Sequence, residues 1–394
     1  MTQSPTPAIV CLTHLPWDFV WQRPQQILSR LARHFPVLYI HEPEIVKTGA
    51  LRLEEVQAES NVNAWQPLVP DRPLELAKWR QRYQSMVRML LFRKGWVRAN
   101  GHCLQPLRPL ILWFYTPTPF YMVDLVPASL VVYDVMDELS NFKGAGDDLP
   151  EREAALLGKA HLVFAGGRSL YEARKGRHPN IHLFPSGVQP DHFAAANDPQ
   201  TLLSPLLQDL PAPRLGYIGV IDERLDLDLL DRLAAEQPGW TLVMVGPVRK
   251  IEPESLPRRP NIHYLGSQPY DDLPQLLKGF DVCLMPFALN EATRSISPTK
   301  ALEYMATHKP IVSSAVPDVV ASWHDAVWIA EGAEGFAAAI NCALNENDQA
   351  RATRVQHERK HLAHSSWDAI TGDMLALLTA DLNKNRAVNG AGEM

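Results

Sequence analysis

Five residues near position 300 combine the groups needed to hold a nucleoside diphosphate. Ser297 and Pro298 have the form of a helix start, with serine as the N-cap and proline at the first helical position. A helix N-terminus presents backbone N–H groups and a partial positive charge, which suit a phosphate. Thr299 adds a hydroxyl, Lys300 a positive charge, and Glu303, one turn later, a carboxylate for the vicinal diol of a ribose. The alternative is an ordinary capped helix with a solvated Lys–Glu face.

A second group of polar residues is acidic. Asp134, Asp137 and Glu138 follow an apolar run at 130–133. Ligands of open α/β sheets bind beyond the carboxyl ends of strands, so these side chains could receive an acceptor proton or hold acceptor hydroxyls. We take Asp137 and Glu138 as the catalytic candidates. The alternative is an acidic helix start that the helix dipole favours.

The loop after the first apolar run is rich in aromatic and polar side chains. Five of them are candidates for the acceptor side: Trp17, Asp18, Trp21, Gln22 and Arg23. Aromatic faces stack on sugar rings, and an arginine can hold a phosphate through two hydrogen bonds. The alternative is a packed loop whose tryptophans cover the edge of the sheet.

The elements that must position these residues form two α/β series. Short apolar runs alternate with helical segments, which is typical of βαβ units and parallel sheets. The expected strands are 8–12, 37–40, 110–114, 130–133, 161–164 and 181–184 in the first series, and 215–219, 242–245, 262–265, 282–285 and 310–313 in the second. A proline-rich linker at 198–213 separates a first domain, 1–197, from a second, 214–365.

Composition narrows the class of protein. The chain has 394 residues and a net charge of −6, so a dedicated nucleic-acid binder, which usually carries a basic excess, is disfavoured. Its cysteines are scattered at 11, 103, 283 and 342, which fits a reducing cytoplasm rather than a disulfide framework. We see neither a signal peptide nor a long apolar run, and expect a cytoplasmic protein.

The modest net charge hides a basic segment at 72–98. It holds eight basic residues and one acid, Glu75, for a net charge of +7. Apolar side chains are interleaved with the charges: Trp79, Tyr83, Met86, Val87, Leu90, Leu91 and Phe92. A basic helix with such anchors can lie on an anionic membrane, which predicts peripheral binding to the inner face of the membrane. The alternative is a solvated basic face on a core-packed helix.

Metal ligation is not expected. His357, His361 and His364 have helical spacing, but basic neighbours surround them. Asp226 and Asp228 form a DxD pair inside a helix-like Leu–Asp repeat. We therefore predict neither a metal nor a cofactor.

Several segments together resemble GT-B glycosyltransferases, nearest the retaining family-4-like group and one of its bacterial branches. The segments are 302–306 (LEYMA) with 309–313 (KPIVS), 184–193 (FPSGVQPDHF), 215–219 (LGYIG), 17–18 with 21–25 (WQRPQ), and 133–139 (YDVMDEL). The resemblance implies two Rossmann-like domains facing across a cleft, with the nucleotide on the second and the acceptor on the first. It also implies a C-terminal helix, 366–382, that crosses back to the first domain.

By the same resemblance, Gly219 and Arg224 join the expected donor site. The group commonly carries Glu-x7-Glu, whose second glutamate matches Glu303, but Ser295 stands at the first position. The group also tends to place an arginine and a lysine after strand 215–219, where this chain has Arg224 alone. The sugar and the stereochemistry are therefore open.

The expected activity is metal-independent, retaining transfer of a sugar from a nucleotide-diphosphate donor to a hydroxyl of a saccharide or a lipid-linked acceptor. The expected donor is a UDP-sugar. Two alternatives are a sugar-nucleotide epimerase or hydrolase of the same fold, and a non-catalytic subunit that binds nucleotide sugar.

Overall fold

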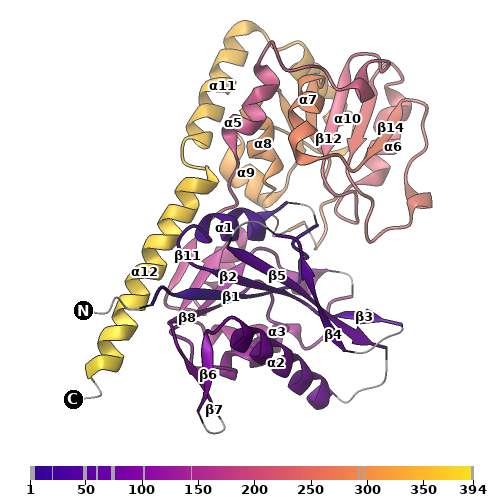
Figure 1. Ribbon diagram of the computed structural model, residues 1–394. Coiled ribbons are helices and arrows are strands. Elements are labelled where there is room, and N and C mark those ends of the chain that lie inside the picture. Colours follow the sequence, from indigo (N-terminus) through magenta and orange to yellow (C-terminus); the bar gives the residue numbers. More distant parts are fainter. Residues whose placement is uncertain are drawn as a thin grey trace. The chain divides into compact units, whose positions relative to one another are not determined.

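The chain forms two compact α/β units in the computed structural model (Figure 1). Residues 5–19, 21–47, 51–58, 61–71, 76–100, 103–142, 144–291, 293–294, 296 and 298–391 are described. The first unit comprises the residues up to Gly166, Leu170–Phe184 and the chain from Thr371 onward. The second comprises Gly167–Ser169 and Pro185–Ile370.

The first unit contains a nine-stranded sheet in the order β11-β10-β9-β8-β1-β2-β5-β3, with β4 antiparallel to β5. Its strands are β1 (Ala8–Thr13), β2 (Val37–His41), β3 (Glu44–Val46), β4 (Arg52–Val56), β5 (Val62–Pro70), β8 (Leu110–Phe114), β9 (Leu130–Val135), β10 (Leu162–Ala165) and β11 (Ile181–Leu183). Strand β1 runs parallel to both neighbours, with Ile9 opposite Val37 and Ile111. Its residues are all buried, as expected for a parallel strand covered on both faces.

Helices cover both faces of this sheet. Figure 1 shows α2 and α3 on one face and α1 on the other. The bounds are α1 (Arg23–Leu31), α2 (Leu76–Arg93), η1 (Phe120–Asp124), η2 (Leu139–Asn141), α3 (Leu149–Leu157) and α4 (Arg168–Arg174), with a separate hairpin of β6 (Val97–Asn100) and β7 (Cys103–Pro106).

The second unit contains a six-stranded parallel sheet in the order β14-β13-β12-β15-β16-β17. Its strands are β12 (Arg214–Ile218), β13 (Thr241–Val245), β14 (Ile262–Gly266), β15 (Val282–Met285), β16 (Ile311–Ser314) and β17 (Trp328–Ala330). Its helices are α5 (Pro190–Ala194), η3 (Ala195–Asn197), η4 (Pro205–Leu207), α6 (Leu227–Glu236), η5 (Pro253–Ser255), η6 (Tyr270–Asp272), α7 (Leu273–Lys278), α8 (Lys300–Ala306), α9 (Pro317–Trp323), α10 (Gly332–Leu344) and α11 (Asp348–Leu362).

The boundary between the units lies earlier than the expected linker at 198–213. The last strand of the first unit, β11, ends at Leu183 and this segment of the unit ends at Phe184. The residues that follow pack into the core of the second unit, where Phe193 and Leu207 are buried. The proline-rich stretch is therefore part of that unit. Helix α12 (Trp367–Ala391) begins in the second unit and belongs to the first from Thr371 onward, and it continues past the expected end at 382.

A buried ion pair connects three distant segments of the first unit. Arg23, at the start of α1, donates from Nε and Nη2 to Asp134 at the end of β9, with Nη2–Oδ1 at 2.8 Å. The two side chains are 1% and 0% exposed. The remaining Nη1 donates to the carbonyl of Phe184 at 2.7 Å. Asp134 is thus a structural partner of Arg23 rather than a carboxylate open to ligand, and Arg23 is not free to hold an acceptor phosphate.

Most of the apolar side chains of α2 that were expected to anchor the protein to a membrane are buried. Tyr83, Met86, Val87, Leu90 and Leu91 are buried in the first unit, so these five side chains stabilise the fold. Among the side chains of this helix that the structure describes, the large apolar ones that remain exposed are Met89 and Phe92, at 39% and 43%. In the described part of the chain, no helix combines the length and apolar character needed to cross a bilayer.

The ion pair gives a stability prediction. Replacing Asp134 with asparagine leaves the buried Arg23 guanidinium without a charged partner, which typically costs about 3–5 kcal/mol. We expect a correspondingly lower urea midpoint, followed by tryptophan fluorescence.

The matched control is Asp231→Asn. Asp231 and Arg259 also form a two-point pair, but both are substantially exposed, and exposed pairs contribute little. Equal effects of the two substitutions would contradict a structural role for the buried pair.

Candidate functional site

The second unit has its candidate site where the strand order reverses. From β12 the chain first adds β13 and β14 on one side and then returns to β15 on the other. In open α/β sheets, ligands bind beyond the carboxyl ends of the strands at such a switch point. The loop after β12 contains Gly219 and Arg224, and α8 follows the loop after β15. The two loops contact each other, since the Ala288 N–H donates to the Arg224 carbonyl at 2.8 Å.

Two glycines let the chain approach closely at this edge. A Cβ on Gly246 would lie 1.8 Å from the carbonyl oxygen of Gly219, and a Cβ on Gly219 would lie 2.3 Å from Cε of Lys300. The Lys300 side chain therefore lies directly against the backbone of Gly219. The structure therefore brings together Gly219 and Lys300, two of the expected donor residues.

Helix α8 is held against β12 by its buried tyrosine. The Ile218 N–H donates to the Tyr304 hydroxyl at 2.9 Å, and Tyr304 is fully buried. One turn apart on the same helix, Lys300 and Glu303 form a pair with Nζ and Oε2 3.8 Å apart, and their side chains are 23% and 18% exposed. Both side chains thus keep partial access to solvent at the switch point.

The start of α8 differs from the expectation. The helix begins at Lys300 with Thr299 as N-cap, so the predicted start at Ser297 and Pro298 was two residues early; Ser297 and Ser295 lie outside the described residues. The N–H groups of Ala301 and Leu302 already donate to the carbonyls of Pro298 and Thr299. These two N–H groups are therefore already used within the start of the helix.

Arg224 already has a carboxylate partner. Its Nε and Nη2 donate to the two oxygens of Asp222, with Nη2–Oδ2 at 2.7 Å. Asp222 is buried, whereas Arg224 is 27% exposed. Asp222 therefore orients the Arg224 guanidinium through two of its five N–H donors.

The expected acceptor residues of the first unit are largely committed to packing. Trp17 is 3% exposed and meets the rings of Trp21 and Tyr39 edge to face. Its backbone N–H donates to His41 Nε2 at 3.0 Å. The Gln22 N–H donates to the Gln25 side chain at the start of α1. Of this group Asp18 is exposed, and Trp21 and Gln22 are partly exposed.

The two catalytic candidates have different surroundings. Both oxygens of Glu138 accept hydrogen bonds from Arg174 Nη2, at 2.9 and 2.8 Å. The same guanidinium binds Glu153 at 2.6 Å. Glu138 is therefore already bound to a cation. Asp137 and Glu138 are both partly exposed, and both stay candidates.

Sequence reasoning missed a pocket at the carboxyl ends of the first unit's strands. Its volume is about 330 Å³. It is lined by Glu42 and Pro43 after β2, Ile45 of β3, Val69 and Pro70 at the end of β5 with Asp71 after it, Thr118 and Pro119 after β8, Tyr121 from η1, and Trp79 and Tyr83 from α2. Glu42 directly follows β2 and lies two residues after the predicted strand 37–40. Its position after a strand was therefore the available signal. Asp71 had no such signal, because β5 was not predicted.

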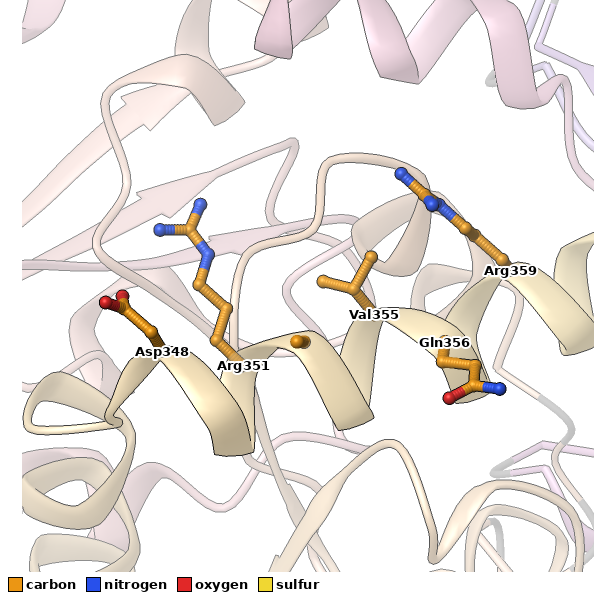
Figure 2. Close-up of a pocket in the computed structure, with 6 residues that line it drawn as sticks. Asp348, Arg351, Val355, Gln356 and Arg359 are labelled. Carbon is orange, nitrogen blue, oxygen red and sulfur yellow. The ribbon is translucent and has the colours of Figure 1, made fainter.

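A second hollow lies beside α11. Figure 2 shows Arg351 and Arg359 on the same side of the helix, with Val355 between them. Each described residue that lines it comes from α11, so it lacks the converging groups from several elements that fix a small ligand.

The metal candidates take other roles. His357 Nδ1 lies 2.8 Å from the Asp325 carbonyl, and His361 Nε2 lies 2.7 Å from an Asp325 carboxylate oxygen. Asp226 accepts from the Leu229 N–H as the N-cap of α6. Within the described ranges, no group of three or more His, Cys, Asp or Glu side chains is arranged to hold a metal ion.

Known proteins match this chain in sequence and in fold. Residues 212–346 match the family described as "Glycosyl transferases group 1". TuaH of Bacillus subtilis (strain 168), a glycosyltransferase assigned to teichuronic acid biosynthesis, is 27% identical over 175 residues. That match covers 42% of this chain and 43% of the relative, less than half the length of either.

Two solved structures show the same fold over nearly the whole chain. Sucrose-phosphate synthase from Thermosynechococcus elongatus has a TM-score of 0.69 at 15% identity, covering 95% of this chain and 98% of the other. The α,α-trehalose 6-phosphate synthase from Burkholderia multivorans has a TM-score of 0.65 at 13% identity, covering 99% of each chain. The expected fold class, α/β of the GT-B type, is confirmed. Together the matches support a glycosyltransferase enzyme.

Gly219→Ala tests the close approach at the switch point. The new methyl group would displace the flexible end of Lys300 and would also press on the hydroxyl of the buried Tyr217, 2.7 Å away, so thermal unfolding is followed alongside binding. We expect the variant to remain folded and its affinity for UDP, measured by calorimetry, to fall by about tenfold or more, since a hydrogen bond to a charged group contributes roughly 1.5–3 kcal/mol.

Gly335→Ala is the control, because the nearest atom to its added Cβ is the Ala330 Cβ at 4.0 Å. Unchanged affinity in Gly219→Ala would show that Lys300 is not placed for the nucleotide.

Proposed function

We propose that the protein transfers a sugar from a nucleotide-diphosphate donor, with UDP as the expected nucleotide, to a hydroxyl of a saccharide or lipid-linked acceptor. One observation supports this most: Lys300 and Glu303 lie together at the switch point of the second unit, with Lys300 against Gly219. The group 1 glycosyl transferase match at 212–346 covers the same segment.

In the proposed donor complex, cations stabilise the leaving diphosphate in place of a metal. Lys300 supplies one positive charge and Arg224, oriented by Asp222, supplies a second. Preorganised charges that face the developing negative charge lower the barrier to its departure. The Glu303 carboxylate accepts hydrogen bonds from the ribose hydroxyls. Pro298 and Thr299 set the position of Lys300 at the start of α8.

The chemical step is a substitution at the anomeric carbon. The acceptor oxygen forms the new glycosidic bond, the bond from the anomeric carbon to the diphosphate oxygen breaks, and the acceptor proton leaves. We propose that Asp137 or Glu138 receives this proton, as the two carboxylates that follow β9. We propose retention of configuration from the resemblance to the retaining group.

The proposed setting is the assembly of a bacterial polysaccharide or glycolipid in the cytoplasm. The partial match to TuaH, a protein assigned to teichuronic acid biosynthesis, supports it. The exposed face of α2 supports a peripheral association with the membrane. Arg82, Arg88 and Arg93 are exposed on it, beside the exposed Met89 and Phe92, and basic residues attract anionic lipid headgroups.

Calorimetry with two ligands separates the proposed roles of Lys300 and Glu303. Lys300→Ala is expected to weaken UDP and pyrophosphate alike, by roughly 10- to 100-fold, since each loses a charge-assisted contact of about 1.5–3 kcal/mol. Glu303→Ala is expected to weaken UDP but not pyrophosphate, which has no ribose.

The control for these two variants is Arg232→Ala, on an exposed side chain of α6. If UDP affinity is unchanged in both Lys300→Ala and Glu303→Ala, the donor site has been assigned wrongly.

Co-sedimentation with vesicles tests the membrane proposal. At physiological salt we expect the protein to bind vesicles that contain phosphatidylglycerol and to ignore vesicles of phosphatidylcholine alone. The double variant Arg88→Glu/Arg93→Glu should weaken binding by at least tenfold, because each basic residue near the surface contributes about 1 kcal/mol.

Arg351→Glu/Arg359→Glu is the matched control, since it reverses two exposed arginines on α11 (Figure 2). Equal loss in both double variants would indicate attraction by overall charge, and no binding by the wild type would contradict the proposal.

A further inference from the structure

The pocket at the carboxyl ends of β2, β5 and β8 has the composition of a carbohydrate site. At about 330 Å³ it lies within the usual range for small-molecule sites, roughly 300–1,000 Å³. Its residues come from three strand ends and from α2, so they converge from separate elements. This placement obeys the rule that open α/β sheets bind ligands beyond the carboxyl ends of their strands.

One wall of the pocket is an aromatic surface held in place by packing. Trp79 and Tyr83, one turn apart on α2, stack with ring centroids 6.0 Å apart and planes 20° apart. The Tyr83 hydroxyl donates to the His41 carbonyl at 3.2 Å, which anchors it to the end of β2. Aromatic faces pack well against the C–H groups of a sugar ring, and large rigid rings lose little entropy on binding.

The polar groups of the pocket can both accept and donate. Glu42 accepts one hydrogen bond, from the Thr116 hydroxyl at 3.2 Å, and a carboxylate has about four acceptor positions. Asp71 contributes a second carboxylate at the exposed side. Burial raises the pKa of Tyr121 to about 12, so its hydroxyl stays protonated and can donate. Such groups suit the hydroxyls of a sugar.

The charged side chains that line the pocket are carboxylates, which disfavour anionic ligands. Among the described lining residues Glu42 and Asp71 are acidic and none is basic. Like charges at short distance repel, more strongly near a protein surface than in bulk water. Two arginines, Arg80 and Arg152, act electrostatically on the Tyr121 hydroxyl from outside this lining. The guanidinium carbon of Arg80 lies 5.0 Å from the centre of the Tyr121 ring and 5.9 Å from that of Phe120. It is occupied in stacking on those rings.

The same helix keeps its basic residues on another side. Lys78 and Arg82 line a different groove, of about 520 Å³, together with Arg52 of β4. Helix α2 therefore presents Trp79 and Tyr83 to the pocket and Lys78 and Arg82 to the groove, while Arg80 stacks on Tyr121. Its composition alone would have suggested one basic surface, whereas the structure separates the two kinds of side chain.

From these observations we propose that the pocket binds a sugar ring that carries no phosphate or carboxylate, as the terminal residue of the acceptor. This rests on the proposed function, since it names the acceptor of that reaction. Uncharged and amino sugars share the required chemistry: hydroxyls for Glu42 and Asp71, and an apolar ring face for Trp79. An ammonium group would add attraction to the carboxylates and to the aromatic faces.

Saturation-transfer NMR on the full chain tests the selectivity. The probes are methyl β-glucoside, methyl β-glucosaminide, glucuronic acid and glucose 6-phosphate. We expect the first two to bind, and the two anionic sugars to bind at least tenfold more weakly. Equal or tighter binding of either anionic sugar would overturn the proposal.

Substitutions locate the binding. Trp79→Ala and Glu42→Gln should each weaken binding of the two favoured glycosides by about tenfold; Glu42→Gln changes no volume and covers the case in which Trp79→Ala fails to fold. Phe92→Ala and Glu54→Gln are the matched controls, since they remove an aromatic ring from the exposed side of α2 and an acid from β4 that does not line the pocket. Unchanged binding in both pocket variants would overturn the assignment.

Binding of UDP to the same samples distinguishes this proposal from the proposed function. If UDP binds but none of the sugars does, the pocket assignment fails and the donor site stands. If the pocket variants lose the sugars while UDP fails to bind the wild type, the pocket stands as a sugar site and the proposed transferase function fails.

Discussion

The buried pair of Arg23 and Asp134 is the constraint on which the first unit depends. It joins the start of α1, the end of β9 and the carbonyl of Phe184, three segments that are far apart in sequence. Phe184 is the last residue of the first unit before the chain enters the second. A Cβ on Gly166 would lie 3.1 Å from the Val135 carbonyl and 3.6 Å from Cζ of Arg23. Gly166 therefore lies close to Arg23, and removal of either partner of a buried charge pair is strongly destabilising.

The proposed donor site depends on a similarly close approach, between the backbone of Gly219 and the side chain of Lys300. Gly246 permits the approach of Gly219, and Gly219 permits the approach of Lys300. Tyr304 holds α8 to the end of β12 through the Ile218 N–H. The charged side chain is thus placed by groups that do no chemistry. The rings of the proposed acceptor pocket are likewise positioned by their surroundings. Trp79 and Tyr83 stack on each other, and Tyr83 is held by the end of β2.

Much of the fold was predictable because its central strands are buried on both faces. Strands such as β1, β8 and β12 are continuous apolar runs, which local patterns identify. Strand β5 was missed because Asn63, Gln66 and Pro67 interrupt its pattern, and β4 because its sequence RLEEV is mostly polar. The pairing of Arg23 with Asp134 spans 111 residues, and no local pattern carries that information. For this reason the sequence suggested Arg23 and Asp134 as ligand-binding residues, whereas in the structure they bind each other.

The central claim is that the two units bind a donor and an acceptor for one transfer reaction. The most direct measurement is to incubate the full chain with UDP-, GDP- and dTDP-sugars, each with and without methyl β-glucosaminide, and to follow both carbohydrate products by mass spectrometry. The account predicts one preferred donor and a disaccharide glycoside that forms only with the acceptor. Donor turnover at the same rate without the acceptor, and with no disaccharide, would contradict it in favour of a hydrolase or epimerase.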